Sequence, residues 1–202
     1  MGIWELHVIP EDSNLLEVVN GFQAGMDRMA NQRWKTIRVG KGRSGIRKHH
    51  GWKGAVEAVR ESNLQRFRKR HVLLVIDFDA DAGNPQVGFE DNPAGARIRQ
   101  VDRMLDEMGL AEYRARIHIL GVCHQSEDLK KIQWGEDAPE KPANFDSIGK
   151  CLAGKCERKD FAIWNDSPVL NGNRDELEAM RRTVCVNLTI PPSMENQIRE
   201  NG

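Results

Sequence analysis

The chain has 202 residues, of which 39% are hydrophobic and 30% are charged, and its formal net charge is zero. This length supports a sizeable hydrophobic core, and the absence of any long apolar run argues against a transmembrane helix and against wholesale disorder. The N-terminus has no basic stretch of the kind that begins a secretory signal, and four unevenly spaced cysteines do not suggest a disulfide scaffold, so we expect a cytoplasmic protein.

Charge is distributed unevenly along the chain. Residues 1–27 carry five acidic and no basic side chains, residues 28–70 carry fourteen basic and two acidic, and residues 71–149 carry eight basic and fifteen acidic. An acid-rich part beside a basic arm is expected where metal chemistry acts on a polyanion, although solvated faces that happen to cluster would give the same pattern.

The first third of the chain alternates between strand and helix patterns. A strand over 3–9 ends before Pro10, and a helix capped by Asp12 or Ser13 follows it. The next predicted elements are a short strand over 35–39, a glycine-rich basic loop over 40–54 and a helix over 53–68.

The rest of the chain continues this alternation. Residues 71–76 (HVLLVI) give the strongest strand prediction, because a short run of branched apolar residues is typical of a strand buried on both faces. Further predicted elements, in chain order, are a helix over 94–108 stopped by Gly109, a strand over 116–122, a short helix from Ser126, an irregular polar segment over 134–160, a strand over 161–164, a helix over 174–182 and a strand over 184–188.

This alternation predicts an α/β fold with a mainly parallel sheet flanked by helices on both faces. In such sheets the functional residues lie in the loops that follow the carboxyl ends of the strands. Three acidic segments occupy these positions: Glu11 with Asp12, residues 77–81, and residues 124–128.

Asp77 and Asp79 are the centre of the predicted site. At a strand end, residues i and i+2 point the same way, so both carboxylates can face one ion, and Asp81 extends the spacing. Hard cations such as Mg²⁺ take oxygen ligands, often one or two carboxylates with waters. Acidic turns are common, so this pattern alone is weak evidence for a metal.

The acids after the other strands strengthen the metal hypothesis. Glu11 is a candidate ligand or general acid/base, and Glu127 and Asp128 follow the strand over 116–122. Each of these acids also suits the start of a helix, where negative charge is favoured. Carboxylates that share one site repel one another, so a cluster of them usually needs a cation.

These segments resemble the Toprim domain of topoisomerases, bacterial primases, recombination proteins and OLD-type nucleases. VIPED (8–12) is similar to the segment that carries the family's glutamate, and LLVIDFDAD (73–81) resembles its DxD motif and the preceding strand. ILGVCHQSEDLKK (119–131) is similar to a later segment in which Ser or Thr and an acid precede a helix. The family often has glycine directly after its glutamate, where this chain has Asp12.

The resemblance implies divalent-metal-assisted phosphodiester hydrolysis, with Mg²⁺ or Mn²⁺ as cofactor and two ions about 4 Å apart. It makes Glu11, Asp77, Asp79 and Glu127 metal ligands and catalytic residues, with Glu11 also a candidate base, and Asp81 and Asp128 supporting ligands. It further implies a nuclease, with DNA favoured as substrate, that acts with a separate ATPase chain in phage defence.

The resemblance covers roughly residues 3–133, and the division of the remaining chain rests on its sequence pattern alone. A Toprim-like catalytic domain is expected over 1–133, including the basic loop 40–54. An extension over 134–190 would complete or flank the sheet, and a flexible tail over 191–202 would follow it.

The basic loop is the candidate nucleic-acid interface. Arginine and lysine beside glycines can neutralise phosphates, and a tryptophan can stack on an unpaired base. The same loop would also suit an acidic protein partner or remain merely solvated. The candidate residues are Lys41, Arg43, Arg47, Lys48, His49, His50, Trp52 and Lys53.

Two other functions remain open. One is a non-catalytic module that binds nucleic acid or protein through the basic loop, with the acids serving as helix caps. The other is a phosphoryl-transfer enzyme that acts on a nucleotide. A zinc site at Cys151 and Cys156 is a weaker alternative, because its spacing is looser than that of zinc knuckles.

Overall fold

The computed structural model describes residues 4–25, 32–37, 51–79, 93–132, 143–152 and Leu170. Its centre is a parallel sheet of strands β1 (Trp4–Pro10), β2 (Gln32–Thr36), β3 (Arg70–Asp77) and β4 (Ile117–Val122). The strand order is β2-β1-β3-β4. The chain therefore runs from β1 outward to β2 and then crosses β1 to form β3, so the direction of winding reverses between β1 and β3.

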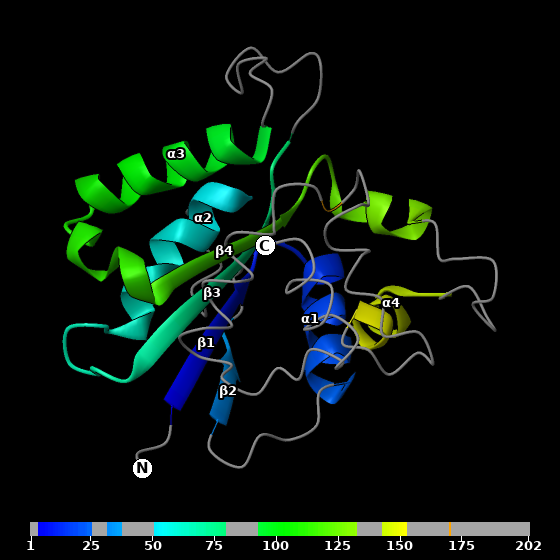
Figure 1. Ribbon diagram of the computed structural model, residues 1–202, viewed down its shortest axis with the longest axis horizontal. Helices are drawn as coiled ribbons and strands as arrows, with labels where there is room; N and C mark the ends of the chain where they lie inside the picture. Colours follow the sequence, from blue (N-terminus) through cyan, green and yellow to red (C-terminus); the bar gives the residue numbers. More distant parts are fainter. Residues whose placement is uncertain are drawn as a thin grey trace, which may run out of the picture.

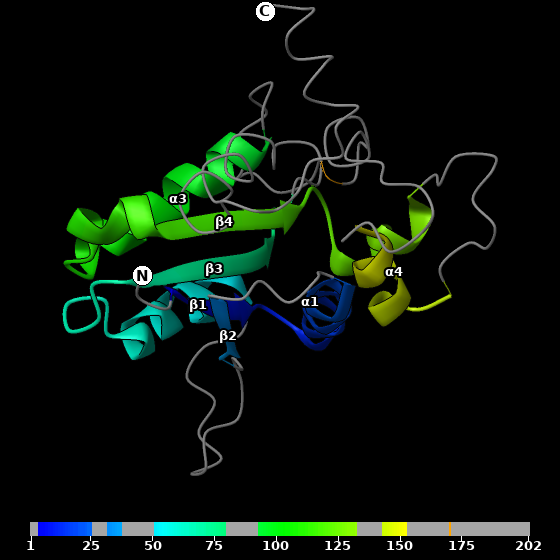
Figure 2. The same ribbon diagram turned by 60° about the horizontal axis from the view of Figure 1, so that its bottom comes forward.

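Helices cover both faces of the sheet (Figures 1 and 2). Helices α1 (Ser13–Gly25) and α4 (Phe145–Leu152) pack on one face, and α2 (Trp52–Glu57) and α3 (Pro93–Glu107) pack on the other. The 3-10 helices η1 (Ala58–Ser62), η2 (Ala111–Arg116) and η3 (Ser126–Lys131) complete the described elements. This confirms the predicted α/β class and parallel sheet.

Strand β3 holds the two layers together because every one of its residues is buried. Leu73 and Val75 point into the core beneath α1 and α4, whereas Leu74 and Ile76 point into the core beneath α2 and α3. Burial of each such side chain contributes about 1.5–3 kcal/mol of hydrophobic stabilisation. The apolar run Val72–Ile76 of this strand follows from its position between two helical layers.

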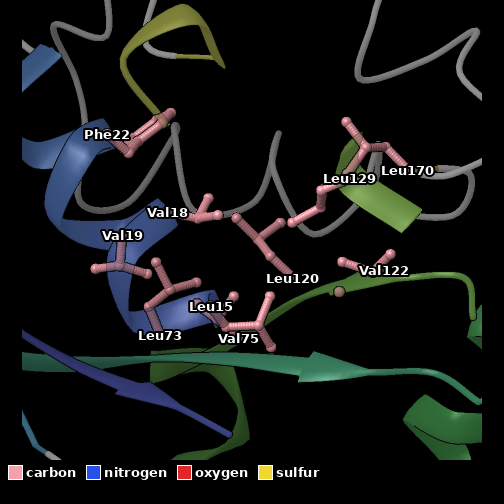
Figure 3. Close-up of a pocket in the computed structure, with 11 residues that line it drawn as sticks. Leu15, Val18, Val19, Phe22, Leu73, Val75, Leu120, Val122, Leu129 and Leu170 are labelled. Atoms are coloured by element: carbon pink, nitrogen blue, oxygen red, sulfur yellow. The ribbon is translucent and has the colours of Figure 1, made fainter. Parts of the chain in front are cut away.

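A small apolar cavity of about 40 Å³ lies between α1 and the sheet (Figure 3). Leu15 and Val18 of α1, Val75 of β3, Leu120 of β4 and Leu129 of η3 are among its lining residues. The described residues that line the cavity expose no polar atom to it, so we interpret it as an apolar packing gap.

The backbones of helices α1 and α4 are in direct contact at two glycines. A Cβ atom on Gly21 of α1 would lie 1.9 Å from the carbonyl oxygen of Asp146, and a Cβ on Gly149 of α4 would lie 2.0 Å from that of Val18. Only glycine fits at both positions. Asn144 caps α4, since its Oδ1 accepts a hydrogen bond from the Ser147 N–H (2.8 Å).

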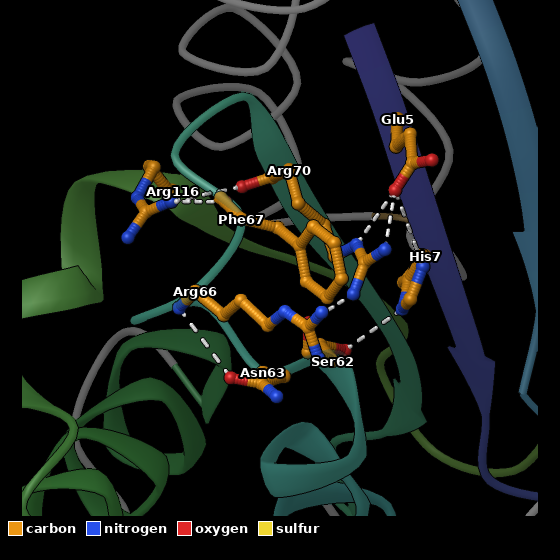
Figure 4. Close-up of polar contacts among 8 residues, drawn as sticks. All are labelled: Glu5, His7, Ser62, Asn63, Arg66, Phe67, Arg70 and Arg116. Carbon is orange, nitrogen blue, oxygen red and sulfur yellow. Dashed lines mark hydrogen bonds and ion pairs between the residues drawn. The ribbon is translucent and has the colours of Figure 1, made fainter.

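A polar cluster closes the amino-terminal end of the sheet (Figure 4). The buried Arg70 guanidinium donates to Glu5 Oε2 from Nε (2.8 Å) and to the Ser62 carbonyl from Nη1 (2.6 Å). Arg116 donates to the carbonyls of Leu64 (2.9 Å) and Phe67 (3.0 Å), which holds the turn before β3. These arginines stabilise the fold at the end of the sheet opposite to the acidic loops.

Most predicted elements appear within a residue or two of their expected bounds, but three predictions differ from the structure. The helix expected over 53–68 ends at Glu57, continues as η1 and stops at Asn63, which has a left-handed backbone (φ 49°). Strand β2 begins three residues earlier than expected. Residues 145–152, expected to be irregular, form α4.

Other predictions lie beyond what the structure describes. The elements expected over 161–164, 174–182 and 184–188, and the domain boundaries, stay predictions. Cys123 is buried, whereas Cys151 is disulfide-bonded, which the cysteine spacing did not suggest. No helix in the described part of the chain is long and apolar enough to span a membrane.

Candidate functional site

Glu11 and Asp77 meet where the winding of the sheet reverses. Glu11 directly follows β1, and its backbone N–H donates to the Val75 carbonyl of β3 (2.9 Å). Its carboxylate Oε2 accepts a hydrogen bond from the Asp77 N–H (2.7 Å). The other oxygen, Oε1, lies 3.3 Å from the position that a Cβ on Gly51 would occupy, so a glycine before α2 leaves room for this carboxylate. Ligand sites of open α/β sheets lie at such reversal points.

The Asp77 carboxylate is buried and only half satisfied. The residue is 8% exposed. Its Oδ2 accepts a hydrogen bond from the Ser126 N–H at the start of η3 (3.2 Å). Its Oδ1 is also buried and accepts no hydrogen bond from any residue in the described ranges. A buried carboxylate oxygen without a donor is costly, and a proton or a bound cation would relieve that cost.

Both carboxyls are easier to protonate than ordinary acids. Burial raises the pKa of Asp77 to about 8, and the nearby Glu11, Asp12 and Asp79 carboxylates add to the rise, against the Ser126 hydrogen bond. Burial likewise raises the pKa of Glu11 to about 7, with contributions from Asp79 and Asp12 that the Asp77 N–H and Arg97 oppose. Without a cation, the pair therefore retains a proton near neutral pH.

A second hydrogen-bonded group adjoins Asp77 through Ser126. The fully buried Ser126 hydroxyl donates to Asp12 Oδ2 (2.8 Å), and Asp12 Oδ1 caps α1 by accepting from the Leu15 N–H (2.7 Å). Asn14 Nδ2 donates to Ser126 Oγ (3.0 Å) and to Glu127 Oε1 (2.9 Å). The structure thus brings Glu127 beside the start of α1 and links it to Asp77 through Ser126.

Asp79 is held by an arginine on α3. Its Oδ2 pairs with Arg97 Nη2 at 2.8 Å, and Arg97 Nε donates to the Phe78 carbonyl (3.3 Å). The Arg97 guanidinium also lies over the Trp52 ring, 4.3 Å from its centroid, and is 3% exposed. Asp79 has a left-handed backbone (φ 48°), an uncommon conformation for a residue other than glycine.

The remaining predicted residues are distributed as follows. Asp128 pairs with Lys131 (2.5 Å), and this hydrogen bond lowers the pKa of Asp128, so its carboxylate faces a lysine. Trp52 and Lys53 line an open groove of about 520 Å³ with Gln100, Arg103, Met104 and Glu107 of α3. Asp81, Lys41, Arg43, Arg47, Lys48, His49 and His50 lie outside the described residues.

The sequence analysis did not single out Arg97, Asn14 or Ser126 as site residues. Arg97 precedes Val101 by four positions on α3, so the apolar face predicted for this helix contains a buried charge, and such a charge needs a partner. Among the described residues, no group of three or more His, Cys, Asp or Glu side chains is arranged to hold a metal ion. The buried Asp77 carboxylate and the half-buried Glu11 carboxylate form the core of the site.

No family model matches this sequence, and neither a curated protein nor a solved structure shows significant similarity to it.

Proposed function

We propose that this protein is a divalent-metal-dependent nuclease that hydrolyses phosphodiester bonds, with DNA as the favoured substrate. The observation that carries the proposal is the buried Asp77 Oδ1, which lacks a donor among the described residues and lies beside a second, half-buried carboxylate, Glu11. A hard cation satisfies both the unpaired oxygen and the like-charge repulsion. The chemistry of this pair therefore fits Mg²⁺ or Mn²⁺.

Each residue of the pair has a distinct role in this proposal. Asp77 would hold the cation through Oδ1, because Ser126 already occupies Oδ2. Glu11 Oε2 is committed to the Asp77 N–H, so Oε1 either completes the cation's ligands or accepts a proton from the attacking water. A divalent cation at this position supplies Lewis-acid activation of the scissile phosphate. A carboxyl with a pKa near 7 is suited to general acid/base work at neutral pH.

The groove between α2 and α3 supports a polyanionic substrate. Lys53 and Arg103 line it together with one acid, Glu107, and Trp52, which also lines it, contacts Arg97 of the site. Positive side chains are needed because the carboxylates would otherwise repel a phosphate backbone. The basic residues over 41–50 precede α2 in the chain and would add to this charge.

The finer parts of the proposal rest on the sequence resemblance. They are a Toprim-like form of the α/β fold and a separate ATPase chain as partner in phage defence. A cytoplasmic location rests instead on the few, unevenly spaced cysteines. The main alternative is a binding module without catalysis. It is favoured by the structural use of two predicted ligands: Asp79 pairs with Arg97, and Asp128 pairs with Lys131.

The test is cleavage of plasmid, linear duplex, single-stranded DNA and RNA by the full chain with EDTA, Mg²⁺ or Mn²⁺. We expect metal-dependent cleavage that falls about 100-fold or more in Asp77→Asn, since the cation contributes several kcal/mol to the transition state. Asp146→Asn, the same change at a half-exposed position of α4 where the carboxylate pairs with Lys150, is the control and should cleave normally. Hydrolysis of mononucleotides alone would favour the nucleotide enzyme. Metal-independent binding without cleavage would favour the module.

A further inference from the structure

The acidic residues around Asp77 fall into two groups according to whether they form an ion pair. Glu11 and Asp77 contact each other and have no described basic side chain as a hydrogen-bond or ion-pair partner. Asp79 instead has a buried cation, the Arg97 guanidinium, on its Oδ2. This division separates the two aspartates of the DxD motif, which the sequence pattern had placed on one ion.

The Arg97 side chain is held from four directions. Its Nη2 pairs with Asp79, its Nε donates to the Phe78 carbonyl, and its Nη1 donates to Gln100 Oε1 (3.0 Å). The indole of Trp52 covers its face. A guanidinium that is 97% buried cannot follow Asp79 if the carboxylate turns toward a metal ion, and it would then remain as a buried charge without a counter-ion.

The backbone adds a second constraint on Asp79. Its left-handed conformation departs from the extended backbone of a strand, so the i and i+2 geometry of a continuing strand does not apply at this position. Phe78 itself is fully buried between the sheet and α3. Asp77 and Asp79 are therefore fixed by different parts of the fold.

We propose that Asp79 is a positioning residue rather than a metal ligand, so that the site binds one divalent cation through Glu11 and Asp77 while Arg97 holds Asp79 away from the ion. This inference rests on the proposed metal-dependent function, and it changes the expected stoichiometry from two ions to one. Arg97 is too deeply buried to touch a substrate, and its role is to fix the turn that follows Asp77.

The test is a titration of the full chain with Mn²⁺. Electron paramagnetic resonance measures the Mn²⁺ that remains free in solution, which gives the number of ions bound. Four proteins are compared: wild type, Asp77→Asn, Asp79→Asn and the double variant Asp79→Asn/Arg97→Gln. The double variant removes both charges and keeps two amides that can still hydrogen-bond, which protects the measurement if Asp79→Asn alone fails to fold with an unpaired Arg97. Circular dichroism checks the fold of each variant.

We expect one tightly bound Mn²⁺ in the wild type, none in Asp77→Asn and one in the double variant. Two tightly bound ions in the wild type would overturn the inference, as would loss of the ion in the double variant while its fold is intact. Failure of the wild type to bind Mn²⁺ at all would instead reject the proposed metal-dependent function, and this inference with it.

Discussion

The Glu11 carboxylate accepts a hydrogen bond from the backbone N–H of Asp77, a residue 66 positions later in the chain. The contact forms because β1 and β3 are neighbours in the sheet, although β2 lies between them in sequence. It places two acids whose mutual repulsion opposes folding into one partly buried site. The stability of the protein should therefore respond to whatever neutralises this pair.

In the absence of metal, the carboxylate pair should destabilise the protein as the pH rises. The pKa values of Glu11 and Asp77 are raised to about 7 and about 8, so the folded state binds protons that the unfolded state has already released above its ordinary pKa near 4. The stability that these protons provide is present in acid and is lost as the pH rises through 7 and 8.

Asp77→Asn should remove much of this dependence. We expect the variant to be more stable than the wild type at pH 8.5 in EDTA, by on the order of 1–3 kcal/mol in urea unfolding. Addition of Mg²⁺ should stabilise the wild type at that pH and leave the variant unchanged. Equal pH slopes for the two proteins between pH 6 and 8.5 would contradict the burial of this pair.

Acid should destabilise the protein through a different group of residues. His71 Nδ1 and His118 Nε2 are 3.0 Å apart on neighbouring strands, and both residues are buried. Burial lowers their pKa values to about 4 and about 3, with Arg116 acting further on His71, and His71 and Arg114 acting further on His118. The unfolded chain therefore takes up protons from about pH 6.5 downward, before the folded chain does.

Each of these histidines should cost about 2 kcal/mol of stability between pH 7 and pH 5. The paired substitution His71→Gln/His118→Gln should lower stability at pH 7 and flatten the decline below it. Urea unfolding at a series of pH values measures both effects. An unchanged slope in the double variant would show that other groups cause the acid sensitivity.

Gly121 of β4 should be intolerant of a side chain. An added Cβ would lie 2.5 Å from the Ile76 carbonyl oxygen and 2.5 Å from the Phe78 ring, which fills the core beside the site. We expect Gly121→Ala to cost about 1–3 kcal/mol or more and to weaken Mn²⁺ binding by displacing the chain between Asp77 and Asp79. Thermal unfolding and Mn²⁺ titration measure these effects.

Gly109→Ala is the matched control for this substitution. Gly109 has a positive φ (70°) but no atom within 4 Å of its Cβ position, so alanine there adds backbone strain without a clash. It should lower stability by about 1 kcal/mol and leave Mn²⁺ binding intact. If the two substitutions changed Mn²⁺ binding equally, the prediction that the position of Phe78 affects the site would be wrong.

The groove between α2 and α3 should contribute to DNA affinity. We expect Lys53→Gln/Arg103→Gln to weaken binding of a single-stranded oligonucleotide in EDTA, and to reduce the salt dependence of log K by about one for each lost phosphate contact. Lys150→Gln, which removes an exposed charge from α4 on the other face of the sheet, is the control. Fluorescence anisotropy at several salt concentrations would show an unchanged slope if DNA does not use this groove.

The parts of the fold with a strong local pattern could be predicted from the sequence. Strand β3 was found because its apolar run is long and uniform, and α3 because its apolar spacing persists for 15 residues and ends at a glycine. Helix α4 was missed because its eight residues span little more than two turns. Its Asn144–Ser147 capping pair was the available indication.

Part of the candidate site could likewise be predicted from the sequence, and part could not. The positions of Glu11 and Asp77 after parallel strands follow from chain order alone, since parallel strands end at one edge of the sheet. The commitment of Asp79 to Arg97 does not, because it depends on the packing of α3 over the end of β3 and on a left-handed residue within a run of acids. Tertiary contacts decide which carboxylate remains without a basic partner.

The contacts of Gly21 with the Asp146 backbone and of Gly149 with the Val18 backbone have a mechanical consequence. Each helix touches the backbone of the other, so α4 cannot slide along α1 without a steric clash. We therefore expect the two helices to move together as a rigid unit. At the amino-terminal end of this unit, Asp12 caps α1 and accepts a hydrogen bond from the Ser126 hydroxyl. A partner that binds α4 and displaces it would therefore disturb the hydrogen bond from the Ser126 N–H to Asp77 Oδ2 without contacting the acidic residues themselves.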